Sequence, residues 1–209
     1  MNINADRSGG SRPQRLVLVR HGETADNVAG RFLGRSDPEL TDRGRAQARL
    51  LSPRVATLVE ATVVTSPARR AVATADEFGL GTIVSDGAFR EIDFGDWEGL
   101  TQSEVAERDP DRFAAFTRGD IDAFPGGESV HAVAERTVAA LHAHDASTLL
   151  VVTHATVVRI LVTALLGLPV SRYRALFGRP SHLSWTELEA TTDGWMLHTY
   201  SSPLVEVDR

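Results

Sequence analysis

The chain has 209 residues, no cysteine and a formal net charge of −6 at pH 7. The missing thiols exclude disulfides, thiolate metal sites and cysteine nucleophiles, and the acidic balance disfavours a nucleic-acid-binding surface. Because 42% of the residues are apolar but no stretch approaches the roughly 20 apolar residues of a membrane helix, we expect a soluble, cytoplasmic protein with one sizeable core.

The first half of the chain predicts strands that alternate with helices. Residues 1–14 have no apolar core of signal-peptide length, so we expect a flexible tail there and a single domain over residues 15–209. The expected elements are a buried strand at residues 16–19, a helix over 41–51, a buried strand at 62–65 and a helix over 66–78. In this last helix, Ser66 and Pro67 suit the N-cap and the first helical position.

The second half continues the alternation and ends in a hairpin. The expected elements are a helix that starts with a capping box at Thr101, a helix over 130–141, a strand at 148–153, a helix over 157–166, and two strands at 183–188 and 195–200. The Asp193-Gly194 pair is a hairpin turn signal. The whole pattern predicts a three-layer α/β/α fold, in which helices cover both faces of a mostly parallel central sheet.

Two of the predicted strands lead into a histidine. His21 follows the strand at 16–19, and His154 follows the strand at 148–153. Ligands of such sheets bind at the carboxyl ends of the strands, where residues distant in sequence can share one pocket. The helix after the strand at 62–65 carries Arg69 and Arg70, so we expect imidazole and guanidinium groups to meet at this edge.

These side chains, together with one carboxylate, suit phosphoryl transfer. Guanidinium groups bind phosphate oxygens in fork geometry and stay ionised at any working pH. A neutral imidazole can attack phosphorus, and a carboxyl group can protonate the departing alkoxide. Since side chains supply the positive charge, we expect neither a metal nor a cofactor.

Five motifs occur in an order that spans about residues 15–160. They are Arg20-His21-Gly22-Glu23-Thr24 with Asn27, Ser66–Ala71 with Thr74 and Ala75, Arg90–Gly99, Pro125–Ser129 and Val151–His154. The ordered set resembles the histidine phosphatase superfamily, the phosphoglycerate-mutase-like clan, whereas a lone Arg-His-Gly triplet would be weak evidence. The Pro125–Ser129 segment is similar to a loop of the family's smaller phosphatases, such as the α-ribazole phosphatases.

The resemblance implies a role for each matching residue. His21 would be the nucleophile that forms a phosphohistidine, and Glu91 would protonate the leaving group and then activate water. His154 would complete the catalytic set. The residues that hold or line the phosphate site would be Arg20, Asn27, Arg70 and His154. The candidate substrate contacts are Phe32, Leu33, Gly34, Ala155 and His182.

Ala155 departs from the family, which usually has glycine after the second histidine. Glycine permits a close approach of the backbone, so we expect the added methyl to alter the pocket wall slightly without abolishing activity. The long basic insertion with which the mutases grip a substrate carboxylate is not evident between Glu91 and His154. Hydrolysis is therefore favoured over mutase chemistry.

Three neighbouring features have structural interpretations. Arg69 cannot face the same phosphate as Arg70, because successive helical residues point about 100° apart. Arg159 lies in an apolar helix, where we expect it to pair with a carboxylate or to extend to the surface, and we leave it out of the catalytic set. The Asp120–Asp122 segment superficially resembles the paired aspartates of haloacid-dehalogenase-type phosphatases, but it follows a glycine rather than a buried strand, so we expect a loop.

Three functions stay open at this point. The leading one is a metal-independent phosphatase that acts on a small phosphomonoester, and the alternatives are a phosphoglycerate-type mutase and a pseudophosphatase that binds phosphorylated partners. The presence of His21 and Glu91 argues against the pseudophosphatase, because a binding module needs neither a nucleophile nor an acid. The sequence does not select the substrate, and the resemblance is compatible with a homodimer.

Overall fold

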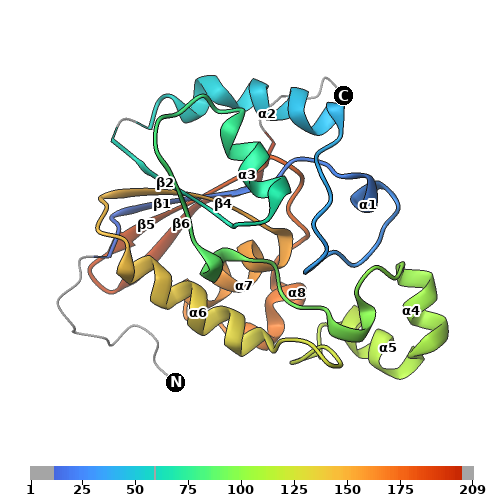
Figure 1. Ribbon diagram of the computed structural model, residues 1–209. Helices are drawn as coiled ribbons and strands as arrows, with labels where there is room; N and C mark the ends of the chain where they lie inside the picture. The colour runs from blue at the N-terminus through green and yellow to red at the C-terminus, as the bar shows by residue number, and fades with distance from the viewer. Residues whose placement is uncertain (1–11, 59, 204–209) are drawn as a thin grey trace.

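A six-stranded sheet forms the centre of the computed structural model, which describes residues 12–58 and 60–203 (Figure 1). The strands are β1 (Arg15–Arg20), β2 (Thr62–Thr65), β3 (Ile83–Ser85), β4 (Thr148–Thr153), β5 (Trp185–Thr191) and β6 (Gly194–Ser202). Their order in the sheet is β3-β2-β4-β1-β5-β6, with β1 to β4 parallel and the β5–β6 hairpin antiparallel. Most of the predicted tail over residues 1–14 lies outside the described residues.

Helices cover both faces of this sheet (Figure 1). One face carries α2 (Asp42–Val55) and α3 (Arg69–Asp76), and the other carries α6 (Val130–Ala143) and α7 (Ala155–Leu165). Beside the carboxyl edge of the sheet stand α4 (Gln102–Arg108) and α5 (Pro110–Arg118). The short helices are α1 (Ala25–Val28), α8 (Tyr173–Leu176) and the 3-10 turns η1 (Gly87–Phe89), η2 (Gly95–Trp97) and η3 (Val170–Arg172). This arrangement confirms the predicted three-layer α/β/α fold.

Consecutive residues of β1 point to opposite faces of the sheet. Leu16 and Leu18 belong to the core cluster that includes α6 and α7, whereas Val17 and Val19 belong to the cluster that includes α2 and α3. Each of these side chains is fully buried, which stabilises the fold by about 1.5–3 kcal/mol per side chain relative to exposure. Burial on both faces explains why the strand is a continuous apolar run.

The register of the parallel strands brings three strand ends to the same level. Arg20 pairs with Thr153, and the backbone N–H of His21 donates to the Thr153 carbonyl at 2.9 Å. On the other side of β4, the backbone N–H of Ser66 donates to the Val152 carbonyl at 2.9 Å. The loops that follow β1, β2 and β4 therefore start side by side.

The helix expected from Ser66 begins three residues later. Its N-cap is Ala68, which makes no side-chain capping hydrogen bond, and α3 starts at Arg69. The prediction was wrong because the N–H of Ser66 still donates to a carbonyl of β4. The Ser66 hydroxyl accepts from the N–H of Ala68 at 3.3 Å and also contacts His154.

Several other element boundaries can be compared with the predictions. The capping box at Thr101 is confirmed, since its hydroxyl accepts from the Glu104 N–H and the Glu104 carboxylate accepts from the Thr101 N–H. The Asp120–Asp122 segment is a loop, and the final hairpin forms as predicted. The seventh helix starts directly after His154 rather than at residue 157. No prediction covered β3, α5 or α8.

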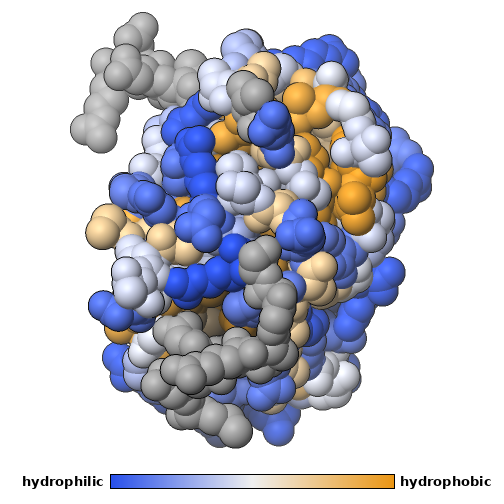
Figure 2. Space-filling model, turned by 90° about the vertical axis from the view of Figure 1, so that its left-hand side faces the viewer, coloured by the Kyte–Doolittle hydropathy of each residue, from blue (hydrophilic) through white to orange (hydrophobic). Residues whose placement is uncertain are grey.

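Figure 2 shows the side of the molecule where β1 and β4 begin, which is on the left in Figure 1. This side is mostly hydrophilic, with apolar side chains gathered in one part of it. Within the described ranges, no helix combines the length and the apolar character needed to cross a bilayer.

Candidate active site

The two histidines predicted to meet lie in contact at the carboxyl edge of the sheet. Their ring centroids are 5.1 Å apart, in an edge-to-face arrangement. His21 is 3% exposed and His154 is fully buried. The spatial prediction on which the site depends is thus met, although the residues are separated by most of the chain.

The hydrogen bonding of His21 defines its tautomer. Nδ1 lies 2.7 Å from the carbonyl oxygen of Gly22. Because a carbonyl oxygen only accepts, Nδ1 carries the proton and Nε2 keeps its lone pair. Burial, followed by the charges of His154 and Arg70, holds the pKa of His21 well below its ordinary value. The imidazole is therefore neutral and nucleophilic at Nε2.

Close backbone packing fixes the loop that carries His21. A Cβ atom on Gly22 would lie 3.0 Å from the Gly44 carbonyl oxygen, and one on Gly44 would lie 2.5 Å from the Glu23 carbonyl oxygen. The N–H of Gly22 donates to the Thr74 hydroxyl of α3 at 2.9 Å. Glycines at both positions let the loop rest on the start of α2 while α3 holds it from the side.

His154 is oriented by the serine that was expected to cap a helix. Its Nε2 lies 2.8 Å from the Ser66 hydroxyl oxygen, and its Nδ1 has no hydrogen-bond partner among the described residues. Burial, followed by the charges of Arg70 and Arg20, lowers the pKa of His154 well below its ordinary value. A buried nitrogen without a partner costs free energy, so Nδ1 is placed to bind a ligand.

Two buried arginines flank the histidines. Arg20 donates to the Pro180 carbonyl at 2.8 Å, and Arg70 donates to the carbonyls of Ser36 and Gly34 at 2.7 and 3.1 Å. In each, Nε is buried and has no partner among the described residues. Burial lowers the pKa of both groups, and with the charge of Arg179 it brings the pKa of Arg20 to about 9.

Arg69 behaves as the helical geometry predicts. Its side chain is 64% exposed and forms an ion pair with Glu39, whereas the side chain of Arg70 is fully buried. The assignment of Arg70, rather than its neighbour, to the site is therefore consistent with the structure.

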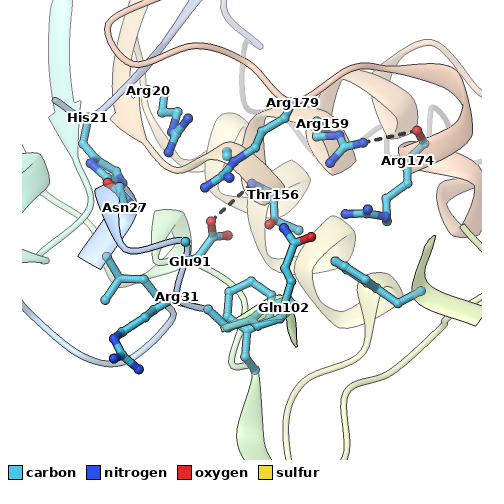
Figure 3. A pocket seen from close by; sticks show the side chains of 16 residues that line it. Arg20, His21, Asn27, Arg31, Glu91, Gln102, Thr156, Arg159, Arg174 and Arg179 are labelled. Atoms are coloured by element: carbon cyan, nitrogen blue, oxygen red, sulfur yellow. Dashed lines mark hydrogen bonds between the residues drawn. The ribbon is translucent and has the colours of Figure 1, made fainter. Parts of the chain in front are cut away.

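Glu91 lies across the pocket from His21 at the N-terminus of α7 (Figure 3). Its carboxylate oxygens accept from the N–H groups of Ile92 at 2.9 Å and Thr156 at 3.2 Å. The side chain is buried, and this burial raises the pKa of Glu91 despite these bonds and the nearby arginines. The shift favours the protonated carboxyl group, which can act as an acid.

The Pro125–Ser129 segment supports the loop of Glu91 from behind. Glu128 pairs with Arg136 of α6 at 2.8 Å, and Arg136 donates to the carbonyls of Ala88, Arg90 and, at 3.5 Å, Glu91. A Cβ atom on Gly127 would lie 2.3 Å from the Asp93 carbonyl oxygen, so glycine lets the two loops touch. This segment thus holds the backbone of the acid rather than contacting the histidines.

A cavity of about 250 Å³ opens onto His21, Arg20 and Glu91, whereas His154 and Arg70 lie behind its lining. Of the residues predicted from the sequence, those that line it are Arg20, His21, Asn27, Phe32, Leu33, Glu91 and Ala155. Asn27 also forms a capping box with Thr24 at the start of α1. Gly34 lines a neighbouring cavity, and its carbonyl accepts from Arg70.

His182 lies beside the nucleophile rather than along the cavity wall. Its ring centroid is 5.7 Å from that of His21, and its Nδ1 lies 3.0 Å from the His21 carbonyl oxygen. Burial and the charge of Arg20 lower the pKa of His182 to about 4. The residue therefore fixes the backbone of His21 as a neutral hydrogen-bond donor.

No residue on the far wall of the cavity was assigned to the site from the sequence. The lining residues in question are Gln102, Phe116, Arg159, Arg174 and Arg179, and Arg31 also lines the cavity, on the side of Asn27 (Figure 3). Arg159 is 6% exposed and donates to the carbonyls of Phe177 and Arg174, and it pairs with no carboxylate in the part of the chain that the structure describes. The expectation that Arg159 pairs with a carboxylate or extends to the surface was wrong because the chain after α7 folds back over the helix. Within the described residues, no cluster of three or more His, Cys, Asp or Glu side chains is arranged to hold a metal ion.

Comparison with known proteins places this geometry in a family. Residues 16–203 match the model of the histidine phosphatase superfamily (branch 1). An acid phosphatase from Mycobacterium tuberculosis is 37% identical over 168 residues, which cover 78% of this chain and 80% of the relative. A glucosyl-3-phosphoglycerate phosphatase from Mycolicibacterium vanbaalenii is 36% identical over 196 residues, which cover 87% and 86%.

Solved structures agree with the sequence matches. The mycobacterial glucosyl-3-phosphoglycerate phosphatase in complex with VO3 superposes with a TM-score of 0.82 at 34% identity, covering 92% of this chain and 100% of that one. The α-ribazole phosphatase from Shigella flexneri gives 0.79 at 27% identity, covering 93% and 100%. The chain therefore belongs to the histidine phosphatase superfamily and is a phosphoric monoester hydrolase of that family.

Proposed function

We propose that this enzyme hydrolyses the phosphomonoester of a small metabolite through a phosphohistidine on His21, without a metal ion. One observation carries the proposal. The neutral imidazole of His21, with its Nε2 lone pair free, packs against the ring of His154, and Nδ1 of His154 and the Nε atoms of Arg20 and Arg70 are buried and without partners among the described residues. Such a set of nitrogens suits the oxygens of a phosphoryl group.

In the first step, the lone pair of His21 Nε2 attacks phosphorus and the phosphorus–oxygen ester bond breaks. Arg20, Arg70 and His154 bind the non-bridging oxygens as their charge is redistributed, and Asn27 lines the same site. Glu91 gives its proton to the departing alkoxide, so the product alcohol leaves neutral. Glu91 is then a carboxylate, and the phosphoryl group is bonded to His21.

In the second step, the carboxylate of Glu91 takes a proton from water as the water oxygen attacks phosphorus. The phosphorus–nitrogen bond breaks, its electron pair returns to Nε2, and inorganic phosphate leaves. This step restores the neutral imidazole and the protonated acid. The lowered pKa of His21 and the raised pKa of Glu91 favour the starting protonation states.

The cavity supports a small substrate. Its volume of about 250 Å³ lies below the usual range of about 300–1,000 Å³ for drug-sized ligands. The relatives named above are an acid phosphatase and a glucosyl-3-phosphoglycerate phosphatase, so the family resemblance leaves the leaving group open. We further propose that the enzyme is cytoplasmic, which cell fractionation would test. We also propose that residues 15–209 form one domain, which limited proteolysis would test.

Hydrolysis of 4-nitrophenyl phosphate in the presence of EDTA tests the reaction itself. We expect activity that the chelator does not reduce and that His21→Ala lowers by at least about 10⁴-fold. His131→Ala removes an exposed imidazole from α6 and should change nothing. Activity that vanishes with EDTA and returns with Mg²⁺ would contradict the metal-independent mechanism.

The two alternatives are separated by different assays. Incubation of 3-phosphoglycerate with a trace of the bisphosphate would reveal a mutase, if isomerisation were much faster than phosphate release. A pseudophosphatase would bind inorganic phosphate but release none from any ester. In the first assay we expect phosphate release to be faster than isomerisation, and in the second we expect phosphate to be released from an ester.

A further inference from the structure

Three arginines besides Arg20 and Arg31 line the cavity, and we call them the distal arginine set: Arg159, Arg174 and Arg179. They come from α7, from α8 and from the loop after α8. In Figure 3, His21 and Arg20 lie on one side of the cavity and Arg174 on the other, with Thr156 and Gln102 between them. Arg179 reaches from the loop after α8 into the space between the two sides, toward Arg20 and Glu91.

Among residues 12–58 and 60–203, the distal arginine set has no acidic partner. Within the described part of the chain, no carboxylate oxygen lies within 4 Å of any of its guanidinium groups. Burial first, and then the charge of a neighbouring arginine of the set, lowers the pKa of Arg159 and of Arg174. The cavity thus concentrates uncompensated positive charge in a protein whose net charge is −6, which is costly unless an anion is bound.

Backbone anchoring accounts for Arg159 but not for the other two arginines, although Arg174 also forms a side-chain hydrogen bond with Tyr173. Arg159 is 6% exposed and ties the segment after α7 by donating from Nε and Nη2 to backbone carbonyls. Arg174 and Arg179 donate to no backbone carbonyl among the described residues, and Nε of Arg174 is buried without a partner. The Arg174 guanidinium lies 3.6 Å from the ring centroid of Phe116, so stacking holds its fork in place.

We infer that the substrate carries a second anionic group, a carboxylate or a further phosphate, which the distal arginine set binds while His21 attacks the first phosphate. Arginine forks bind both kinds of oxyanion in bidentate geometry. The inference rests on the proposed function of the same cavity, and it names the substrate class as compact, doubly anionic phosphomonoesters.

Two matched pairs of substrates test this inference. The first pair is 3-phosphoglycerate and glycerol 3-phosphate, which differ in one carboxylate. The second is 1,3-propanediol bisphosphate and 3-hydroxypropyl phosphate, which differ in one phosphate. At constant ionic strength, we expect kcat/KM to be higher by about tenfold or more for the doubly anionic member of at least one pair. Equal values within both pairs would overturn the inference.

In the pair of substrates that shows the preference, Arg174→Gln should lower the ratio of the two kcat/KM values to about threefold or less. The reason is that it removes a guanidinium group from the second anion only. Arg172→Gln is the control, since it removes the same charge from an exposed residue two positions away that does not line the cavity. The control should keep the ratio of the unmodified enzyme. A ratio that Arg174→Gln leaves unchanged would also overturn the inference.

Calorimetric titration separates this inference from the proposed function. With His21→Ala, which cannot form the phosphohistidine, the dissociation constants of the four compounds should show the same preference. Equal dissociation constants would overturn the inference even in an enzyme that hydrolyses all four. A tenfold preference in binding, together with no hydrolysis by the unmodified protein, would support the inference and contradict the proposed function.

Discussion

The two ends of the cavity are built from different kinds of structure. At the end that would bind the phosphoryl group, His21, His154 and Arg70 each lie within two residues of the start or end of a strand or helix. At the opposite end, Arg174 lies on a helix of four residues and Arg179 on the loop after it. The register of a buried sheet fixes the first end, whereas the second can change with local sequence. Two relatives with nearly the same sequence identity to this chain, 37% and 36%, are named as different phosphatases, which agrees with this difference.

The replacement Glu91→Gln should have the largest effect among changes that leave the nucleophile intact. It removes the proton donor, so we expect kcat for an alkyl ester such as glycerol 3-phosphate to fall by about 10²–10⁴-fold. Glu135→Gln, at an exposed position of α6, is the control. Steady-state assays check this, and a variant with more than half the normal kcat would remove Glu91 from the mechanism.

The pH profile sharpens this prediction. Glu91 must be protonated in the free enzyme and its pKa is raised, so kcat/KM should fall as pH rises through that pKa. His21 must be neutral and its pKa is lowered, so activity should persist until pH falls through that lower value. In Glu91→Gln, the alkaline limb should disappear from the weak remaining activity. An unchanged alkaline limb would assign it to another group.

Arg136→Gln probes the support of Glu91 from behind the site. Arg136 contacts no substrate in our account, but it holds the carbonyls of the loop that ends in Glu91. We expect kcat to fall about tenfold with KM nearly unchanged, because the phosphate-binding groups stay in place. Arg112→Gln, which removes an exposed arginine from α5, should leave both constants unchanged. A rise in KM alone would contradict this positioning role.

The phosphoryl end could be predicted from the sequence, and the reasons are physical. Apolar runs of four to six residues predict buried parallel strands, and the residues just after them must share one edge of the sheet. This rule placed His21 and His154 correctly. The prediction of an N-cap at Ser66 failed, because the backbone of Ser66 forms a hydrogen bond to β4 that the sequence does not display.

The opposite end could not be predicted, because no short pattern identifies it. Arg159 was misjudged since an arginine in an apolar helix usually extends to water, whereas here the Phe177 and Arg174 carbonyls cover it. The fifth helix was missed even though Pro110 at its first position and Gly119 in the left-handed region after its end are standard signals. With α5 missed, the position of Phe116 beside Arg174 was missed as well.

Ser66→Ala tests how firmly the phosphoryl end is held. The change removes the hydrogen bond to Nε2 of His154, so we expect kcat/KM to fall by about threefold to tenfold for every phosphomonoester. The equal effect on all substrates distinguishes this change from Arg174→Gln, which should act on doubly anionic substrates alone. Ser103→Ala, at an exposed position of α4, is the control. An effect that depends on the leaving group would contradict this account.

Ala155→Gly should have the smallest effect. The methyl group lines the cavity at the first residue of α7, and the backbone there already has helical geometry. We expect kcat to change by less than about twofold and stability to fall by up to about 1 kcal/mol, because glycine is a poorer helix former than alanine. Thermal unfolding and steady-state assays check both values. A large change in kcat would show that the methyl group shapes the reacting geometry.

The central claim is that His21 carries the phosphoryl group between the two steps. The most direct test is to mix the enzyme with a ³²P-labelled ester, quench within milliseconds in alkali, and map the labelled peptide by mass spectrometry. We expect an alkali-stable, acid-labile label on His21 that disappears when unlabelled substrate is added in excess. Steady hydrolysis with no label on His21, or with the label on another residue, would contradict it.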